Sequence, residues 1–351
     1  MKIFISYKIP KQISGGGNQF LKSFRKMCIK NKCHASYPEE ADICLFNSHQ
    51  YALDTFLLKK RKKNLILIHR IDGPMRLYND LTDKRDLIVN TINQYFADGS
   101  VFQSEWSKLH NGRMGLKIKP FNTVIKNAPD GKIFNAENRI PFSMDRKIRL
   151  VCASWSHNWK KGFEVYQWLD RNLNYSKYEL TFIGNSPVRF SNIRQIGPLS
   201  SQALSDEFKR NDIFITASQK DPCSNVLIEA MHCGLPCVAL RDGGHPEIIA
   251  NGGELFETAD QIPYLLEKIC NDYASYQGRI ELETMEEVWG QYFAFMECIY
   301  DKMQQREYSP KRITIAGAVK LLSVLLWSRV YPVFRNRTEK LTGLRETTQR
   351  P

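Results

Sequence analysis

The sequence lacks a long apolar run near its start, and it has no internal repeat or low-complexity segment. Its first residues, MKIFISYKIPKQ, hold an apolar run too short for a signal peptide and predict a first strand. The nine cysteines, an odd number, are scattered singly through apolar segments, which disfavours a secreted disulfide framework. We therefore expect a reducing, cytoplasmic compartment.

Motifs for metal, nucleotide-cofactor and nucleophile chemistry are also missing. No Asp-x-Asp occurs, no Ser/His/Asp order stands out, and the glycine run at 14–21 lacks the G-x-G-x-x-G spacing of a dehydrogenase. His232, Cys233 and Cys237 are close in sequence, but Gly-Leu-Pro between the cysteines ends a helix and starts a strand. Buried thiols are expected there rather than zinc ligands, so we expect no metal and no cofactor.

The sequence has fewer acidic than basic residues: 37 Asp and Glu against 50 Lys and Arg, which gives a net charge of +13. Such an excess indicates an anionic partner: a phosphorylated substrate, a membrane surface or a nucleic acid. Residues 306–351 hold ten basic and three acidic side chains, so more than half of the excess lies in the tail. The body shows no stretch of interleaved basic and aromatic residues, which ranks a nucleic-acid binder low.

What the chain does contain is two series of short apolar runs alternating with helical patterns. Alternation of this kind predicts parallel sheets with helices on both faces. Residues 128–147 are polar and rich in turn formers, so they are expected to link the two series. The expected strands are at 2–6, 42–46, 64–68, 99–103, 148–153, 178–184, 212–217 and 237–240. The expected helices are at 20–30, 51–60, 84–97, 162–171 and 203–210, followed by one starting near Ser224.

We therefore expect an α/β protein with two Rossmann-like, doubly wound domains that face each other across a cleft. The expected boundaries are 1–140, 141–300 and a basic, apolar helical tail at 301–351, with the last helix of the second domain able to pack back on the first. In such folds, ligands bind at the carboxyl ends of the strands, and the cleft between the two domains is the natural site.

The stretch QKDPCSNVLIEAMHCGLPCVALRDGGHPEII, residues 219–249, sets two acids around a predicted helix start. Ser224 or Asn225 suits the N-cap, and Gly234 and Pro236 end the helix. The free amides and the positive dipole end of this helix form an anion site at the cleft. Glu229 lies about one turn inside, at a distance suited to two vicinal hydroxyls, and Asp221 precedes the amides. Taken alone, Asp221 could equally be a turn residue and Glu229 a helix-dipole partner.

The whole stretch resembles the E-x7-E segment of the retaining GT-B glycosyltransferases of family 4, here running from Asp221 to Glu229. The Glu-Ala-Met-x-x-Gly-Leu-Pro and Gly-Gly-x-Pro-Glu that follow are similar to the same family, and the resemblance extends over about residues 1–300. The segment SWSHNWKKGF at 154–163 looks like the family's phosphate-contacting loop. Its lysine would be Lys161; the usual arginine five residues earlier is replaced by Ser156, and Lys160 is a candidate substitute. A solvated helix start is the alternative, although lysines there are unfavourable without an anion.

In the first half, the resemblance covers IHRIDGP at 68–74 and the glycine loop. His69 matches a family histidine that faces the transferred sugar, and Arg70 and Asp72 are candidates for sugar or acceptor contact. Ser104 and Asn127 also lie in segments like those of the family, but we interpret them as a helix cap and a turn residue. The implied catalytic residues are His69, Lys161 and Asp221. The implied donor-binding residues are Gly16, Gly17, Lys160, Lys161, Asp221, Ser224, Asn225 and Glu229.

The resemblance implies a metal-independent hexosyltransferase that moves a sugar, with retention, from a nucleoside-diphosphate sugar to a hydroxyl of a glycan or lipid-linked acceptor. Cell-surface polysaccharide or glycolipid biosynthesis is the expected setting. A non-catalytic nucleotide-sugar or carbohydrate-binding protein on the same scaffold is the alternative, because Ser156 and Asp221 depart from the family pattern.

The tail at 313–334 is apolar but is interrupted by Lys320 and Arg329, so a transmembrane span is disfavoured. Two interpretations remain. The tail either lies on an anionic membrane surface, making the protein peripheral on the cytoplasmic face, or docks on the two-domain body. Because the two charges lie on opposite sides of a helix, the sequence shows no clean amphipathic face.

Overall fold

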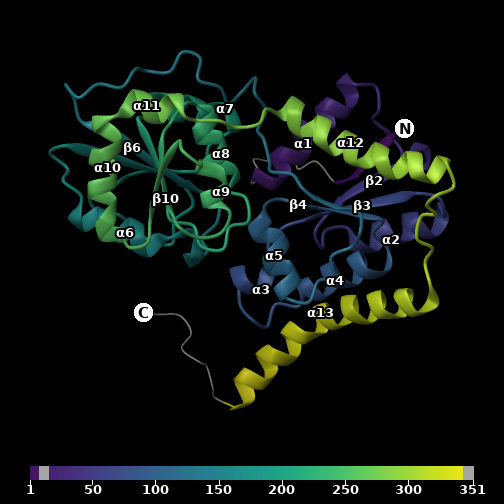
Figure 1. The fold of residues 1–351 in the computed structure, drawn as a ribbon. Coiled ribbons are helices and arrows are strands. Elements are labelled where there is room, and N and C mark those ends of the chain that lie inside the picture. The colour runs from purple at the N-terminus through teal and green to yellow at the C-terminus, as the bar shows by residue number, and fades with distance from the viewer. Residues whose placement is uncertain (8–15, 343–351) are drawn as a thin grey trace.

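The computed structural model describes residues 1–7 and 16–342, with only the backbone described for 329–342. Two α/β domains lie next to each other, each built on a parallel sheet (Figure 1). The predicted fold class is therefore confirmed. The first sheet has the order β1-β2-β3-β4-β5. Its strands are β1 (Ile3–Ser6), β2 (Ile43–Asn47), β3 (Ile66–Ile71), β4 (Gly99–Phe102) and β5 (Asn122–Val124).

The helices of the first domain cover both faces of this sheet, because its strands are apolar on each side. They are α1 (Gly16–Lys30), the 3₁₀ helix η1 (Pro38–Glu40), α2 (Ala52–Arg61), α3 (Met75–Tyr78), α4 (Arg85–Tyr95) and α5 (Glu105–Arg113). Ser104 caps α5, as predicted: its hydroxyl accepts a hydrogen bond from the Ser107 amide at 3.0 Å.

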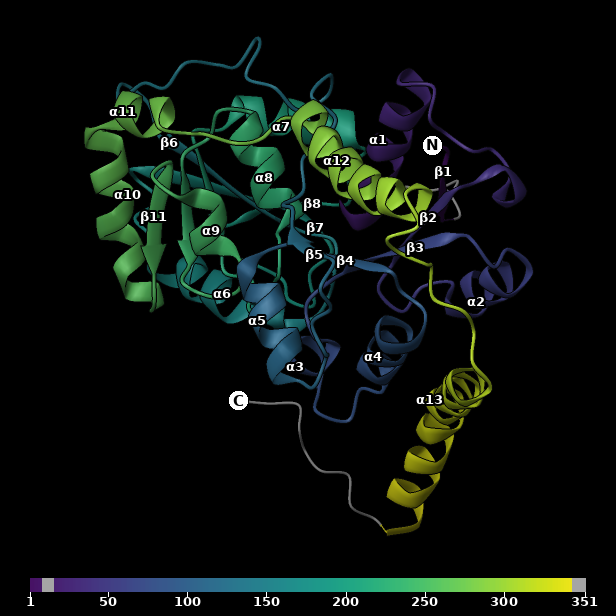
Figure 2. The same ribbon diagram turned by 45° about the vertical axis from the view of Figure 1, so that its right-hand side comes forward.

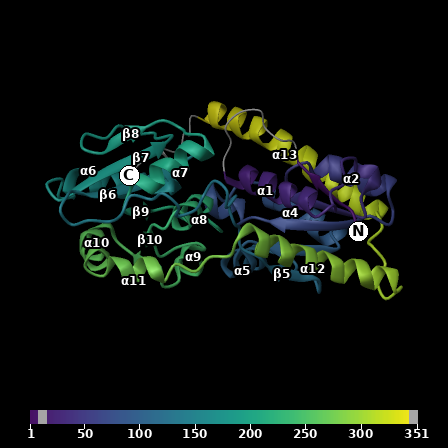
Figure 3. The same ribbon diagram turned by 90° about the horizontal axis from the view of Figure 1, so that it is seen from above.

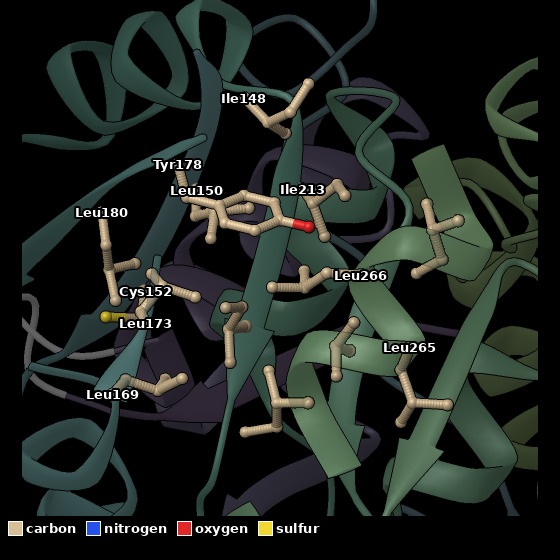
Figure 4. Close-up of a cluster of buried hydrophobic side chains, with 14 of the residues drawn as sticks. Ile148, Leu150, Cys152, Leu169, Leu173, Tyr178, Leu180, Ile213, Leu265 and Leu266 are labelled. Carbon is tan, nitrogen blue, oxygen red and sulfur yellow. The ribbon is translucent and has the colours of Figure 1, made fainter. Parts of the chain in front are cut away.

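The second sheet has the order β11-β10-β9-β6-β7-β8, with every pairing parallel. Its strands are β6 (Ile148–Ser154), β7 (Tyr178–Gly184), β8 (Arg194–Ile196), β9 (Ile213–Thr216), β10 (Cys237–Leu240) and β11 (Gly253–Phe256). Its helices are η2 (Trp159–Lys161), α6 (Phe163–Asn172), α7 (Ser201–Arg210), α8 (Asn225–His232), α9 (His245–Ile249), η3 (Ala259–Gln261), α10 (Ile262–Asn271) and α11 (Tyr273–Gly278). Figure 4 shows part of the core between the sheet and α6 and α10, where side chains such as Leu150, Leu169 and Leu266 interdigitate.

The chain then returns to the first domain through α12 (Met285–Gln304). Thr284 and Glu287 form a capping box at its start. Tyr292 and Met296 on its apolar face join the core of the first sheet, together with Phe24 of α1. Figures 1 and 3 show α12 lying alongside the first domain. The first domain is thus completed by a helix that follows the second domain in sequence.

The tail docks on the opposite face of the first sheet. Tyr308 donates a hydrogen bond to Asp98 at 2.7 Å, the Lys311 amide donates to the same oxygen at 2.7 Å, and Lys59 pairs with Asp98 at 3.2 Å. Helix α13 (Ile315–Thr342) then runs against α4 (Figure 2). Eight of the nine cysteines are buried thiols and Cys298 is exposed, as expected for a chain without a disulfide framework.

Candidate active site

A cavity of about 540 Å³ lies between the two domains. The first domain contributes the start of α1 and the loops after β3 and β4, and the second contributes the loops after β6 and β9 and the start of α8. Its polar lining includes Gln19, Asp72, Gln103, Lys161, Asp221, Ser224, Asn225 and Glu229. A smaller hollow of about 280 Å³ shares Gly16, Asn225 and Glu229 with it. The cavity therefore lies at the carboxyl ends of the strands, as predicted.

The start of α8 faces this cavity. Ser224 occupies the N-cap position in extended conformation, but its side chain accepts no capping hydrogen bond from the helix. The Asn225 side chain is engaged elsewhere, since its Oδ1 accepts a hydrogen bond from Asn127 at 3.1 Å. The amides of the first turn thus lack a side-chain cap, which is the arrangement that binds an anion.

Gly16 and Gly17, predicted in a loop after the first strand, are the first residues of helix α1 and line the cavity. A Cβ on Gly16 would lie 2.4 Å from the Cβ of Asn225, so only glycine allows the two helix starts to approach this closely. The adjoining Ser14 and Gly15 lie outside the described residues.

Asp221 and Lys161 form an ion pair of 2.9 Å at the cavity wall. Burial opposes the charge on Lys161, but Asp221 and Tyr78 together hold its pKa above its ordinary value. Burial likewise opposes the charge on Asp221, while Lys161 and His245 hold the pKa of that carboxyl below its ordinary value. Both side chains are therefore ionised at neutral pH, and the lysine is available to a phosphate that enters beside it.

The loop that carries Asp221 is fixed by the glycines that follow β10. The Gly244 amide donates a hydrogen bond to the Asp221 carbonyl at 2.9 Å. Gly243 has φ +62°, and a Cβ there would come within 2.2 Å of that same carbonyl oxygen. A side chain at position 243 would therefore push the acid-bearing loop out of place.

Glu229 lies within the first two turns of α8 and is 7% exposed. Burial raises the pKa of this carboxyl to about 8, and no ion pair with a cation is found for it within the described residues. A buried carboxyl without a charged partner is the kind of group that a ligand's hydroxyls can satisfy.

The structure does not bring Lys160 into the cavity. Its ammonium donates to the Leu77 carbonyl of the first domain, so the predicted replacement for the missing arginine is not in place. Lys160 and Lys161 sit in a single 3₁₀ turn, and the turn directs them to different partners. Ser156 does line the cavity, where its carbonyl accepts a hydrogen bond from Ser154 at 2.9 Å.

His69 also lies away from the cavity, which corrects the prediction that it faces the sugar. It is completely buried in β3, stacked on Phe46 with ring centroids 4.4 Å apart, and its Nε2 lies 2.9 Å from the Ser48 carbonyl oxygen. Burial lowers the pKa of this imidazole to about 4, so it is neutral. Because β3 ends at Ile71, Asp72 and Gly73 lie beyond the strand and reach the cavity, whereas His69 lies within the sheet.

Asp72 lines the cavity, whereas Arg70 is buried behind it. The guanidinium of Arg70 lies 3.3 Å from Asp72 and 2.6 Å from Asn127. Asn127 in turn donates to Gln103 at 3.0 Å and to Asn225 in the second domain. The interpretation of Asn127 as a turn residue is therefore wrong: it connects the first domain to the start of α8. Its partner lies 98 residues away, so no local pattern could have revealed this role.

Sequence reasoning also missed Glu247, which makes a second contact between the domains. Its two carboxylate oxygens accept hydrogen bonds from the amides of Glu105 and Trp106, each at 2.8 Å. These amides form the first turn of α5, so a carboxylate of the second domain caps a helix of the first. The Gly-Gly-x-Pro-Glu segment ends on this residue, but only the fold shows what it contacts.

Comparisons with known proteins agree with this geometry. Residues 150–272 match the family described as Glycosyl transferases group 1. N-acetyl-alpha-D-glucosaminyl L-malate synthase of Bacillus anthracis is 44% identical over 224 residues, covering 63% of this chain and 48% of that protein. A probable sucrose-phosphate synthase of Thermosipho melanesiensis is 28% identical over 166 residues, covering 43% and 38%. The chain thus aligns with less than half the length of each of these relatives.

Solved structures share the fold over most of the chain. HepE of Anabaena, in complex with UDP and glucose, has a TM-score of 0.64 at 13% identity over 84% of this chain and 99% of its own. Sucrose-phosphate synthase from Thermosynechococcus elongatus has a TM-score of 0.59 at 16% identity over 82% and 79%. Residues 150–272 therefore match the Glycosyl transferases group 1 family, within a chain that has the two-domain GT-B fold.

Proposed function

We propose that this protein is a retaining glycosyltransferase that moves a sugar from a nucleoside-diphosphate sugar to a hydroxyl of a glycan or lipid-linked acceptor. The observation that carries the proposal is the convergence of three features in one interdomain cavity. These are the uncapped start of α8, the paired charges of Lys161 and Asp221, and the buried carboxyl of Glu229. Each suits a different part of such a donor.

The diphosphate lies against the first amides of α8 and the ammonium of Lys161. Helix dipole and lysine act in a site of low dielectric, where they stabilise the charge on a departing diphosphate most strongly. Two vicinal ribose hydroxyls donate to Glu229, which favours its ionised form and lowers the pKa that burial has raised. The sugar then lies toward Asp221, whose second role is to accept hydrogen bonds from the sugar hydroxyls.

In the reaction, the bond between the anomeric carbon and the diphosphate oxygen breaks as the acceptor oxygen bonds to the same face of that carbon. The acceptor proton passes to the leaving phosphate, so no side chain of the enzyme has to act as nucleophile or base. Closure of the cleft over the bound donor excludes water and protects the donor from hydrolysis. We propose that the transfer needs no metal ion and no cofactor, and that it serves cell-surface polysaccharide or glycolipid biosynthesis in the cytoplasm.

The relatives support this proposal by their names, probable sucrose-phosphate synthase and N-acetyl-alpha-D-glucosaminyl L-malate synthase. HepE is described in complex with UDP-glucose as well as with UDP and glucose. The second candidate is a non-catalytic nucleotide-sugar binder. It is favoured by two departures from the family pattern, because Ser156 replaces the arginine and Lys160 donates to a carbonyl of the first domain.

Thermal unfolding with a panel of nucleotides and nucleotide sugars tests the proposal. Nucleoside diphosphates and their sugars should raise the melting temperature, by an amount that reflects about 2.7 kcal/mol at a ligand concentration 100 times the Kd. Glu229→Ala should mainly weaken donor binding, whereas Lys161→Ala should lower turnover as well. Release of nucleoside diphosphate that depends on an acceptor separates an enzyme from a binder. Stabilisation without any release would favour the binder, and no stabilisation by any donor would exclude both.

A further inference from the structure

Helix α13 leaves a narrow apolar stripe uncovered on the first domain. Ile315, Val319, Leu322 and Leu326 are 86%, 58%, 51% and 65% exposed, and no described residue covers them. Their spacing of four, three and four residues places them on one side of the helix, at 100° per residue. Large side chains this exposed, in a continuous row, mark an interaction surface rather than scattered surface residues.

The opposite side of α13 packs against the first domain. Leu321 and Val324 are buried in the core formed by α2 and α4, with Ile88 and Ile92. Upstream, the hydrogen bonds of Tyr308 and the Lys311 amide to Asp98 fix the entry to the helix. The structure shows docking of the tail on the body, one of the two expected interpretations, and the helix still presents a second apolar face. Two apolar faces also explain why the sequence shows no single amphipathic face.

We infer that this stripe is a docking surface for an anionic lipid bilayer, which α13 contacts while lying in the interface. Within the described residues, no helix is long and apolar enough to cross a membrane. Lys320 is exposed on the same helix, about 100° around it from Val319, and residues 306–351 together hold ten basic and three acidic side chains. A row of exposed apolar side chains, on a segment whose sequence carries a net positive charge, matches acyl chains below anionic headgroups.

The same charge disfavours a second copy of this chain as the occupant. A twofold contact through the stripe would bring two tails of charge +7 together, and like charges facing each other weaken such a contact. The inference does not rest on the proposed function, because binding to vesicles is measured without donor or acceptor.

The test uses the full chain and vesicles of phosphatidylcholine, alone or mixed with phosphatidylglycerol. The stripe variant is Ile315→Ser with Val319→Ser and Leu322→Ser. The control variant makes the same change at Leu109, Met144 and Tyr264, which are 51%, 55% and 70% exposed on other parts of the surface. Wild type and control should sediment with anionic vesicles and bind neutral ones far less. The stripe variant should bind anionic vesicles roughly tenfold more weakly or worse, with an unchanged melting temperature.

Added salt and Lys320→Glu should each weaken binding, because part of the attraction is electrostatic. Equal binding by stripe and control variants would overturn the inference, as would a wild-type protein that ignores anionic vesicles. Sedimentation velocity tests whether the stripe is instead a contact between two copies of the chain. If the stripe variant converts a dimer to a monomer without a change in vesicle binding, the stripe is a contact between copies and the inference is wrong.

Discussion

At the scale of single residues, the site is defined by how each charge is partnered. Asp221 and Lys161 satisfy each other, so they are ionised and held in place before a ligand arrives. Glu229 has no such partner, and its burial without a cation is costly for the charged form. The two acids that stood out in residues 219–249 therefore differ in electrostatic state, and the difference can be measured.

Glu229→Gln tests that difference through the pH dependence of stability in the ligand-free protein. The folded-state pKa of Glu229 is raised to about 8, from 4.5 in the unfolded chain. The folded state therefore keeps the proton between these pH values while the unfolded state releases it. The stability linked to Glu229 is fully present below about pH 4.5 and is lost as pH rises through 8.

The Gln variant removes this loss, so it should be more stable than wild type at pH 9 by a few kcal/mol and differ little at pH 5. Denaturant unfolding at several pH values measures the change. Glu267→Gln, a change of an exposed carboxyl, is the control and should follow wild type at every pH. Parallel curves for Glu229→Gln and wild type would mean that Glu229 is ionised in the folded state.

At the scale of elements, the long apolar runs predicted the buried strands, whereas short strands without buried residues gave no signal in the sequence. The runs NLILI and IRLVCA became β3 and β6 because their residues are buried on both faces of a parallel sheet. The strands β5 and β8 went unpredicted, since each has three residues and none of them is buried. Their pairing is set by neighbouring strands, which a local window does not contain.

The residues of the candidate site divide in the same way, into those that the sequence predicts and those that only the fold reveals. The loop-helix unit from Asp221 to Glu229 could be read from sequence because its caps and acids are neighbours in the chain. The roles of Asn127 and Glu247 could not, because each depends on a contact with the other domain. Lys160 and Lys161 are adjacent and chemically identical, so only the turn that holds them decides which one reaches the cavity.

Two adjacent residues of α13 give opposite predictions. Leu321 is fully buried, and Leu321→Ala should destabilise the protein by roughly 2 to 4 kcal/mol, because a cavity remains in the core shared with α4. Leu322→Ala, one position on and exposed, should change stability by less than about 0.5 kcal/mol. Chemical unfolding and limited trypsin digestion of the tail measure both effects. Equal stability and equal cleavage of the two variants would show that α13 does not dock in this way.

At the scale of the whole molecule, the cavity exists because the domains hold a particular spacing. Asn225 of the second domain packs on Gly16 and accepts a hydrogen bond from Asn127. Separately, Glu247 caps α5. The first contact involves Gly16 and Asn225, which line the cavity, while the second lies outside the cavity lining. Glu247 can thus be changed without removing a group that a ligand would touch.

Glu247→Gln should weaken domain closure without altering either domain. The variant removes a negative charge from the amides that begin α5, an interaction worth about 1 kcal/mol at a helix start. If closure and ligand binding are coupled, the affinity for a nucleoside diphosphate should fall roughly fivefold. Small-angle scattering should then show a larger radius of gyration in the ligand-free variant. Glu257→Gln, at an exposed carboxyl of the same domain, should leave both quantities unchanged. A Glu247 variant with wild-type affinity and wild-type dimensions would show that the remaining contacts, Asn127 with Asn225 among them, hold the domains together by themselves.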